Sequence, residues 1–452
     1  MPEQAPARSS LLFSRDALLR LIIPLVIEQL LLMTVGMADT VMVTTSGEAA
    51  VSGVSLVDNI NTLIIQVFSA LSTGGAVVVS QYLGRQDTDN AKAASKQLLY
   101  AMCALSLLLM GAALVLRQHI LALIFGRVEA DVMENALVYF LLTATAYPFM
   151  GIYNAGAALF RAMGNSKVSM FCSLVVNVIN ITVNAVLIFG LKMGVLGAAL
   201  ATLTARIVSA LVMVVLLSRK DNPLCIATPG CMKPQRDVIG KILKIGIPSG
   251  VENGMFQIGK LLVSSLTATF GTAAIAANAV ANSVAGFANI PGIAIGLAIV
   301  TVIGRCIGAG EKEQARYYSK RLLGLAYAGM VLADLALFAL VKPIIACFAL
   351  SAEAARIATQ LLVSFAICAA LIWPLSFTLP NVLRAAGDAK YTMEVSVFSM
   401  WVFRVASSYF FAGTMGLGVL GVWIGMYVDW GFRTLLFLIR YRRGKWLEKR
   451  VV

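Results

Sequence analysis

The sequence is poor in charged residues, histidine and paired cysteines, which most enzyme and metal sites require. Charged residues make up only 13% of its 452 positions, and the single histidine, His119, falls at the end of an apolar run. A catalytic or metal site built on histidine is therefore nearly excluded. The seven cysteines are an odd number, and most lie inside apolar segments, where they are expected to be small buried hydrophobes. No disulfide framework is predicted.

Apolar residues are abundant instead, and they decide the class of protein. Hydrophobic residues are 59% of the chain and the mean hydropathy is +0.86, which is more than a water-soluble domain can bury. The length allows about twelve spans of roughly 20 residues each. We therefore predict an all-α integral membrane protein. The spans are expected at 16–43, 54–83, 92–117, 131–160, 167–190, 195–218, 239–268, 274–306, 315–341, 353–383, 390–412 and 418–439.

The formal net charge of +14 is unevenly placed along this pattern. Lysine and arginine gather at alternate span ends, on the side that holds the N-terminus, the segment 219–236 and the tail 440–450. This asymmetry predicts a multi-pass protein of a bacterial-type inner membrane with both termini in the cytoplasm. The basic tail is expected to meet anionic lipid headgroups, and nucleic-acid binding is the weaker interpretation.

The two halves of the chain repeat one another at a period of about 224 residues. An Ile-Pro pair followed by Glu28 recurs before Glu252, and RAMGNSKVSM (161–170) recurs as RAAGDAKYTM (384–393). Six spans per half is an even number, so the halves have the same orientation and a pseudo-twofold axis along the membrane normal. The predicted organisation is an N-terminal lobe at 1–218, a cytoplasmic link at 219–236 and a C-terminal lobe at 237–452.

Carboxylates inside the apolar spans are candidate functional groups. A charged side chain at the centre of a bilayer costs at least about 2.5–3.5 kcal/mol, so each one needs a reason. Glu28 and Asp39 are eleven residues apart on the first span, which puts them on one face, roughly 16 Å apart. Asp39 is either an inert, hydrogen-bonded carboxylate at the interface or a carboxylate in a wet cavity that can trade a proton or hold Na⁺. We favour the second interpretation.

Other polar residues within the spans form two groups of candidates. Asn180 and Asn184 share a face of the fifth span at i, i+4, and Thr202 adds a hydroxyl in the sixth. Lys260 is expected to have a carboxylate or carbonyl partner, with Glu252 at a suitable angle. Arg206, Arg404 and Arg433 are expected to snorkel to the interface. Asp58, Asn59 and Asn61 open the second span. The substrate-cavity candidates are Glu28, Asn59, Asn154, Glu252, Gln257 and Lys260.

Two glycine patterns imitate nucleotide sites. GMFQIGKL (254–261) lacks the Ser or Thr that a P-loop needs after its lysine, and no strand precedes it. GLGVLG (416–421) opens a membrane helix, where small residues allow close packing. No cofactor is expected, so the energy source is an ion gradient of H⁺ or Na⁺.

Four segments resemble the multidrug and toxic compound extrusion (MATE) family. They are VGMADTVMV (35–43), SQYLG (80–84), RAMGN (161–165) and GVLGAA (194–199). The resemblance covers nearly the whole chain and implies two six-helix lobes around a central cleft. It also implies that Asp39, Asn180 and Thr202 belong to a cation-coupling site. Asn184 stands where that family site has a second aspartate, which departs from the two-carboxylate pattern.

The expected function is a secondary antiporter that exports drug-like organic compounds, cationic or amphipathic, in exchange for H⁺ or Na⁺. The coupling site would be Asp39, Asn180, Asn184 and Thr202, with Na⁺ at Asp39 as the only metal considered. A lipid-linked sugar flippase or polysaccharide exporter of the same superfamily is the alternative. A membrane enzyme is not expected, because no Ser/His/Asp or His/Cys constellation is visible. No obligatory protein partner is evident.

Overall fold

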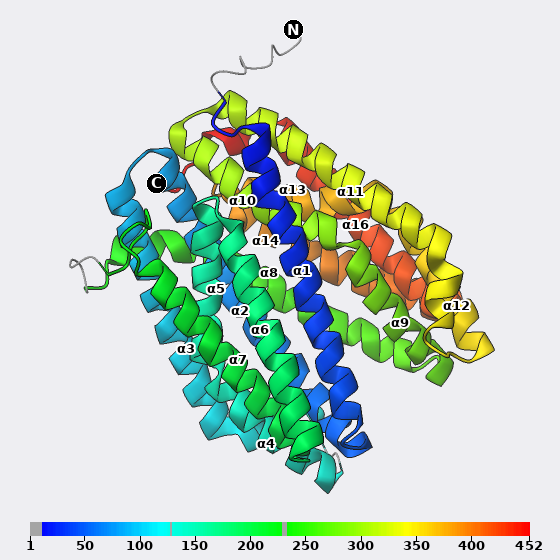
Figure 1. Ribbon diagram of the computed structural model, residues 1–452. Coiled ribbons are helices and arrows are strands. Elements are labelled where there is room, and N and C mark those ends of the chain that lie inside the picture. The colour runs from blue at the N-terminus through cyan, green and yellow to red at the C-terminus, as the bar shows by residue number, and fades with distance from the viewer. Residues whose placement is uncertain (1–10, 127–128, 228–232) are drawn as a thin grey trace. The chain divides into compact units, whose positions relative to one another are not determined.

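In the computed structural model, residues 11–126, 129–227 and 233–452 are described, and every regular element among them is a helix (Figure 1). The chain divides into two compact units. We call Asp16–Gly246 the N-lobe, and Ile247–Val452 together with residues 11–15 the C-lobe. The all-helical prediction is confirmed.

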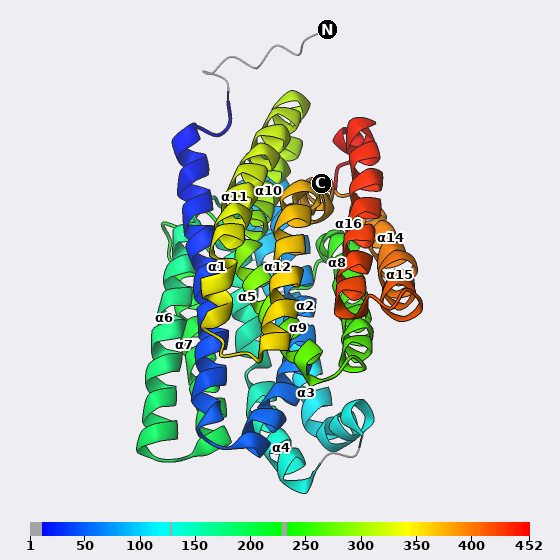
Figure 2. The same ribbon diagram turned by 90° about the vertical axis from the view of Figure 1, so that its right-hand side faces the viewer.

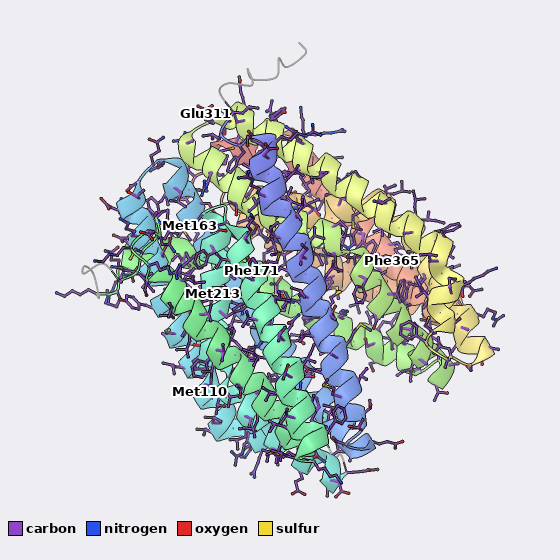
Figure 3. The ribbon with its side chains drawn as sticks, in the orientation of Figure 1. Met110, Met163, Phe171, Met213, Glu311 and Phe365 are labelled. Atoms are coloured by element: carbon purple, nitrogen blue, oxygen red, sulfur yellow. The ribbon has the colours of Figure 1, made fainter. Side chains whose placement is uncertain are left out.

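The N-lobe is a bundle whose central helix is α2. Its helices are α1 (Arg15–Thr44), α2 (Glu48–Gly84), α3 (Thr88–Phe125), α4 (Ala130–Thr145), α5 (Tyr147–Ala162), α6 (Ser166–Asn184), the π-helix η2 (Ala185–Gly190) and α7 (Gly194–Leu217). Helix α2 packs against α3, α4 and α5, while α6 and α7 lie side by side (Figure 2). Met213 of α7 is fully buried beside Gly156 of α5, where the missing side chain lets the helices approach (Figure 3).

The C-lobe is built around an aromatic core. Its helices are α8 (Arg236–Ala268, which begins in the N-lobe), α9 (Thr272–Ala288), α10 (Ile290–Ala309), α11 (Lys312–Ala346), α12 (Ala352–Trp373), η3 (Pro374–Thr378), α13 (Leu379–Ala385), α14 (Ala389–Phe398), η4 (Ser399–Val405), α15 (Ala406–Ser408), η5 (Tyr409–Thr414), α16 (Gly418–Arg442) and η6 (Lys445–Glu448). Phe365 of α12 packs edge-on against Trp423 and Trp430 of α16 (Figure 3). Such pairs hold α12 and α16 together at the centre of the lobe.

Several spans are broken at or beside a proline. The expected span 131–160 is the pair α4 and α5, bent by 48° at Ala146, two residues before Pro148. The expected span 274–306 is divided into α9 and α10 just before Pro291. Pro374 opens the π-helix η3, because it cannot donate the hydrogen bond that an α-helix needs there. Pro24 and Pro248, in contrast, lie inside the continuous helices α1 and α8.

By length and apolar composition alone, ten helices of the described chain could cross a membrane, or eleven if the bent pair is one span. Helix α8 is not among them, since Glu252, Asn253, Gln257 and Lys260 interrupt its apolar sequence. Two of these polar residues, Glu252 and Lys260, belong to the cluster and the pocket of the C-lobe described below.

The basic C-terminal tail folds back onto the C-lobe. Trp446 of η6 is buried and stacks on Tyr441, with ring centroids 5.5 Å apart. The carboxylate of Asp388, itself 1% exposed, pairs with Arg440 at 2.8 Å and with Lys449. Part of the tail's positive charge is thus neutralised within the protein, and contact of the remainder with lipid headgroups stays a prediction.

Gly421 and Gly431 of α16 test whether small residues are needed for helix packing. A Cβ atom on Gly421 would lie 2.5 Å from the backbone nitrogen of Ala412 in η5, whereas one on Gly431 would meet nothing within 4 Å. We expect Gly421→Ala to destabilise the protein by about 1–3 kcal/mol through overpacking. Gly431→Ala should be neutral or stabilise it by roughly 0.5–1 kcal/mol, because glycine costs conformational entropy in a helix.

The measurement is the apparent melting temperature of each purified variant in detergent. Gly421→Ala should melt below the wild type and Gly431→Ala at or above it. Equal shifts for both variants would show that the contact between α16 and η5 does not limit stability.

Candidate functional site

The N-lobe holds a buried cluster of Glu28, Arg161 and Ser169. Glu28 of α1 is 3% exposed, and its carboxylate accepts from Arg161 Nη1 of α5 at 3.2 Å and from Ser169 Oγ of α6 at 2.7 Å. The three residues come from three helices, and each carboxylate oxygen has a partner. The attraction within a buried ion pair offsets the desolvation of its charges only when all partners are at hydrogen-bond distance. The cluster therefore constrains how α1 packs against α5 and α6.

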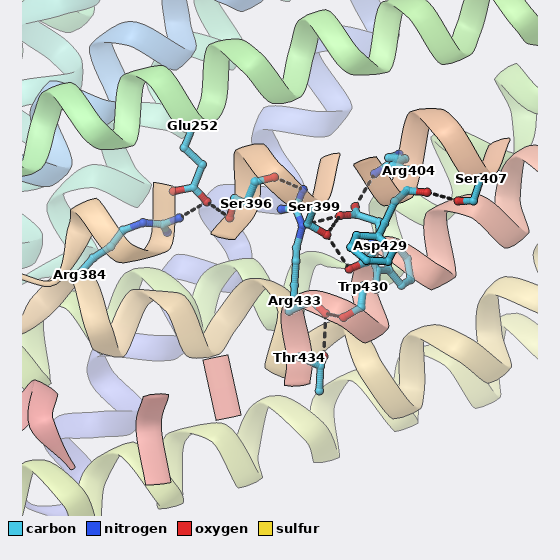
Figure 4. A network of polar contacts seen from close by, with 12 residues as sticks. Glu252, Arg384, Ser396, Ser399, Arg404, Ser407, Asp429, Trp430, Arg433 and Thr434 are labelled. Carbon is cyan, nitrogen blue, oxygen red and sulfur yellow. Dashed lines mark hydrogen bonds and ion pairs between the residues drawn. The ribbon is translucent and has the colours of Figure 1, made fainter. Parts of the chain in front are cut away.

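The C-lobe repeats this cluster at Glu252 (Figure 4). Glu252 of α8 accepts from Arg384 Nη2 of α13 at 2.6 Å and from Ser396 Oγ of α14 at 2.7 Å. The glutamate and the arginine are the residues that the sequence repeat aligns with Glu28 and Arg161. Both glutamates therefore have neutralising partners within their own lobe, and their predicted part in a substrate cavity stays a prediction.

Asp39 lies near the end of α1 and contacts the polar residues of α6. Asn184 donates from Nδ2 to Asp39 Oδ1 at 2.7 Å and to Asn180 Oδ1 at 3.1 Å. Asn180 and Asn184 are 3% and 1% exposed, and the buried Oδ1 of Asn184 has no hydrogen-bond partner among the described residues. Asn177, one turn earlier on α6, donates to the backbone oxygen of Leu31 at 2.8 Å and holds α6 against α1.

A pocket of the N-lobe opens beside Asp39. It has about 350 Å³ of empty space, open solvent included, and is lined by nine residues. Its polar lining is Asp39, Ser55, Asp58, Tyr139 and Thr202, and its apolar lining is Val43, Val51, Val54 and Ala198. The pocket thus brings together carboxylates from α1 and α2 with hydroxyls from α2, α4 and α7.

Asp58 is the second acid of this pocket. The Tyr139 hydroxyl donates to Asp58 Oδ1 at 3.3 Å, and Asn61 Nδ2 lies 3.5 Å from the same oxygen. Tyr147 in turn donates to Asn61 Oδ1 at 3.1 Å, which links α5 to α2. Asp58 is held by neutral donors alone, so among the described residues no cation pairs with either acid of the pocket at ion-pair distance. Such a site can take up a proton or a cation.

The structure therefore brings Asp39, Asn180, Asn184 and Thr202 into one region, as two hydrogen-bonded amides and two pocket-lining residues. Whether they couple transport to an ion stays a prediction. Within the described residues, no three His, Cys, Asp or Glu side chains gather to hold a metal ion.

Three further cavity candidates lie outside the linings of the N-lobe pocket and of a second, C-lobe pocket described below. Asn59 is exposed and donates to the backbone oxygen of Ser55, and Asn154 donates to the backbone oxygen of Met150, both on their own helices. Gln257 is half-buried on α8 and lines neither pocket. All three residues lie on helices, but none of them lines either pocket.

Two expectations about basic residues of the C-lobe are wrong. Lys260 has no ion-pair partner among the described residues, because Glu252 is held by Arg384. Arg404 and Arg433 do not snorkel: they are 7% and 2% exposed and share the buried carboxylate of Asp429, at 3.6 and 2.8 Å (Figure 4). Snorkelling is needed only where a cation has no partner inside the protein, and Asp429 supplies one.

Sequence reasoning missed Asp58, Tyr139 and Asp334 as candidates. Asp58 opens its span, and an acid in an apolar segment is the same signal that indicates Asp39. Tyr139 carried no signal, because a tyrosine in a span is ordinary. Asp334 of α11 is 2% exposed, and neither of its carboxylate oxygens has a hydrogen-bond partner among the described residues. It lies outside both pocket linings.

The fold and the polar groups between its spans define a class: a multi-pass helical membrane protein of two repeated lobes, the architecture of secondary transporters. The sequence model of the MatE family matches residues 24–186 and 248–410, one match in each half. The chain therefore belongs to the MATE family of transporters.

Individual relatives match the chain over nearly its whole length. The uncharacterized transporter YisQ of Bacillus subtilis (strain 168) is 29% identical, and the match covers 94% of each chain. The probable multidrug resistance protein NorM of Thermotoga maritima is 27% identical over 97% of this chain and 94% of its own. Among solved structures, one described as the outward-facing conformation of a multidrug resistance MATE family transporter has a TM-score of 0.88 at 21% identity, covering 99% of this chain and 100% of that one. At that identity the likeness shows the fold.

The buried clusters can be tested by removing one charge. Glu28→Gln removes the carboxylate that pairs with Arg161. Breaking a fully buried pair costs about 3–5 kcal/mol, and we expect less here because the Arg161 side chain is 16% exposed. The matched control is Glu394→Gln, since Glu394 pairs with Lys390 at 3.7 Å while more than half exposed. Such exposed pairs contribute about 0–1 kcal/mol.

We expect Glu28→Gln to lower the apparent melting temperature in detergent clearly and Glu394→Gln to leave it almost unchanged. A wild-type melting temperature for Glu28→Gln would mean that the cluster does not hold the N-lobe together.

Proposed function

We propose that the protein is a cation-coupled antiporter that exports organic compounds, cationic or amphipathic, in exchange for H⁺ or Na⁺. The single observation that supports this best is the N-lobe pocket. It presents two carboxylates, Asp39 and Asp58, without a paired cation at ion-pair distance among the described residues. An ionised carboxylate within a membrane span destabilises the protein unless it binds a proton, a cation or another positively charged group.

Asp39 is the proposed coupling residue. Its Oδ1 accepts from Asn184, and the Oδ1 of Asn184 has no hydrogen-bond partner among the described residues. A bound cation could therefore be held by the carboxylate and by this amide oxygen together. Amide, hydroxyl and carboxylate oxygens are hard ligands that suit Na⁺, and the same carboxylate can instead take a proton. Either ion, together with Asn180, Asn184 and Thr202, would favour one arrangement of the N-lobe, and substrate would favour another.

Export of drug-like compounds is supported by the relatives. Several are named multidrug resistance proteins, and the family match covers both halves. The acidic pocket suits a cationic or amphipathic substrate, which could compete with the coupling ion for the same charge. These observations favour drug export over the flipping of lipid-linked sugars.

The proposed location is the cytoplasmic membrane of a bacterium, with both termini in the cytoplasm. This orientation follows from the clustering of lysine and arginine at alternate span ends. The coupling ion would be the only bound species needed besides substrate, and no enzymatic step or protein partner is part of the proposal.

The test is transport in proteoliposomes with a sodium gradient and a pH gradient imposed separately. Wild-type protein should move a fluorescent organic cation under one gradient or both. Asp39→Asn should reduce this gradient-driven transport to background, because the amide cannot ionise, yet the variant should insert and elute as a folded protein.

The matched control is Asp131→Asn, an exposed acid in the first turn of α4 that lies outside the pocket. It should transport like the wild type. Wild-type rates for Asp39→Asn, or transport by the wild type without either gradient, would end the proposal.

A further inference from the structure

A second pocket lies entirely within the C-lobe and is basic. It has about 350 Å³ of empty space, open solvent included, and forms between α8, α9, η4 and α16. Lys260 and Arg404 are its charged lining residues, and none of the described residues that line it is acidic. The N-lobe pocket has the opposite charge, although the two halves of the chain are repeats.

The positive charge around this pocket exceeds what Asp429 can neutralise. Its Oδ1 binds Arg433 Nε at 2.8 Å and also accepts from Ser399 at 2.5 Å, while Oδ2 lies 3.6 Å from Arg404 Nη1. Asp429 is fully buried, so this carboxylate is committed to two guanidinium groups. Lys260 remains without an ion-pair partner among the described residues. The excess charge of Arg404 and Arg433 over Asp429 is buried, and Lys260, whose side chain is exposed, adds a further positive charge beside it, so the pocket attracts an anion.

Hydrogen-bond donors of the pocket are also left over. The buried Arg404 Nε has no hydrogen-bond partner among the described residues. Asn278 Oδ1 already accepts from Trp423 Nε1 at 2.9 Å and from Asn282 Nδ2 at 3.1 Å. The side-chain nitrogen of Asn278 can therefore still donate to a ligand. Together with the Lys260 ammonium, these groups form a set of donors for which the described residues supply no acceptor. That is the complement of a carboxylate, which only accepts.

Arg404 is held in place from its other side. Its guanidinium lies 5.2 Å from the ring centre of Phe256, and Arg433 lies 5.4 Å from the same ring. Arg404 also belongs to the π-helix η4, and π-helical turns are frequent at functional sites. A cation fixed by a ring and a carboxylate, with a spare N–H, is preorganised for an anionic ligand.

We propose that the C-lobe pocket binds the carboxylate of an organic substrate, with Lys260 and Arg404 as its anchors. The methyl and methylene groups of Val263, Val422 and Met426 offer an apolar surface to the rest of the molecule. The substrate class is then an amphipathic organic compound that carries a carboxylate, such as a zwitterion.

This inference rests on the proposed function only in calling the bound compound a transported substrate. Binding itself is measured without an ion gradient. If Asp39→Asn transported normally while the carboxylate preference described next depended on Lys260, the coupling proposal would fail and this one would stand. The two failures are therefore distinguishable.

The experiment compares rhodamine B, which has a free carboxylate, with its ethyl ester, which does not. Binding to the full-length protein in phosphatidylcholine nanodiscs is followed by fluorescence anisotropy at neutral pH. We expect the wild type to bind the acid more tightly than the ester. Lys260→Gln should weaken binding of the acid about tenfold, as for loss of a hydrogen bond to a charged group, and leave binding of the ester unchanged.

Two further variants show whether charge at this position is the cause. Lys260→Arg should keep the preference for the acid, because it retains the positive charge. Lys342→Gln removes an exposed lysine of α11 that lies outside the pocket, and should behave like the wild type. Equal affinity of the wild type for both dyes, or equal weakening of both by Lys260→Gln, would overturn the proposal.

A lipid headgroup is the competing anion. The titration is therefore repeated in nanodiscs that contain phosphatidylglycerol. An unchanged preference for the acid supports a substrate carboxylate, whereas loss of that preference in the presence of anionic lipid assigns the pocket to a lipid phosphate and overturns the proposal.

Discussion

Each lobe of this protein depends on one buried ion pair that ties its first span to its fourth and fifth. In the N-lobe Glu28 binds Arg161 and Ser169, and in the C-lobe Glu252 binds Arg384 and Ser396. In hydrocarbon an ion must find its partner within the protein, so these glutamates and arginines constrain where the helices can pack. Asp39, Asn180 and Asn184 lie on α1 and α6, two of the helices that the N-lobe cluster joins, and Lys260 lies on α8, which the C-lobe cluster holds.

The same constraint separates structural charges from candidate functional ones. Glu28 and Asp429 have their charge matched by nearby guanidinium groups, and they fix helices. Asp39 and Asp58 have only neutral donors within hydrogen-bond range, and Lys260 has no ion-pair partner in the described part of the chain. A charge without a partner lowers the stability of the folded protein, and binding of an ion or a substrate of opposite charge would restore that stability. Both pockets lie at such charges.

The two lobes began as copies and have diverged in the sign of their pockets. The glutamate–arginine pair is retained in both, which preserves the packing of each bundle. Acids line the N-lobe pocket and bases line the C-lobe pocket. Divergence of this kind needs few substitutions, because a pocket residue can change without disturbing the core on which the lobe depends.

The sequence alone determined the class, the repeat and much of the candidate list. Apolar runs predict spans because the bilayer sets their length, and Asp39, Asn180 and Asn184 could be chosen as charged or polar groups in those runs. Pairing was decided only by the tertiary structure. Glu252 shares an angle with Lys260 on α8, yet it binds Arg384, which is 132 positions away. The pocket role of Tyr139 and the buried pairing of Arg404 likewise depend on which helices meet. Helical spacing shows only which residues share a face of one helix. The partner of a charged residue in hydrocarbon can come from any helix that packs against it, and so it depends on the tertiary structure.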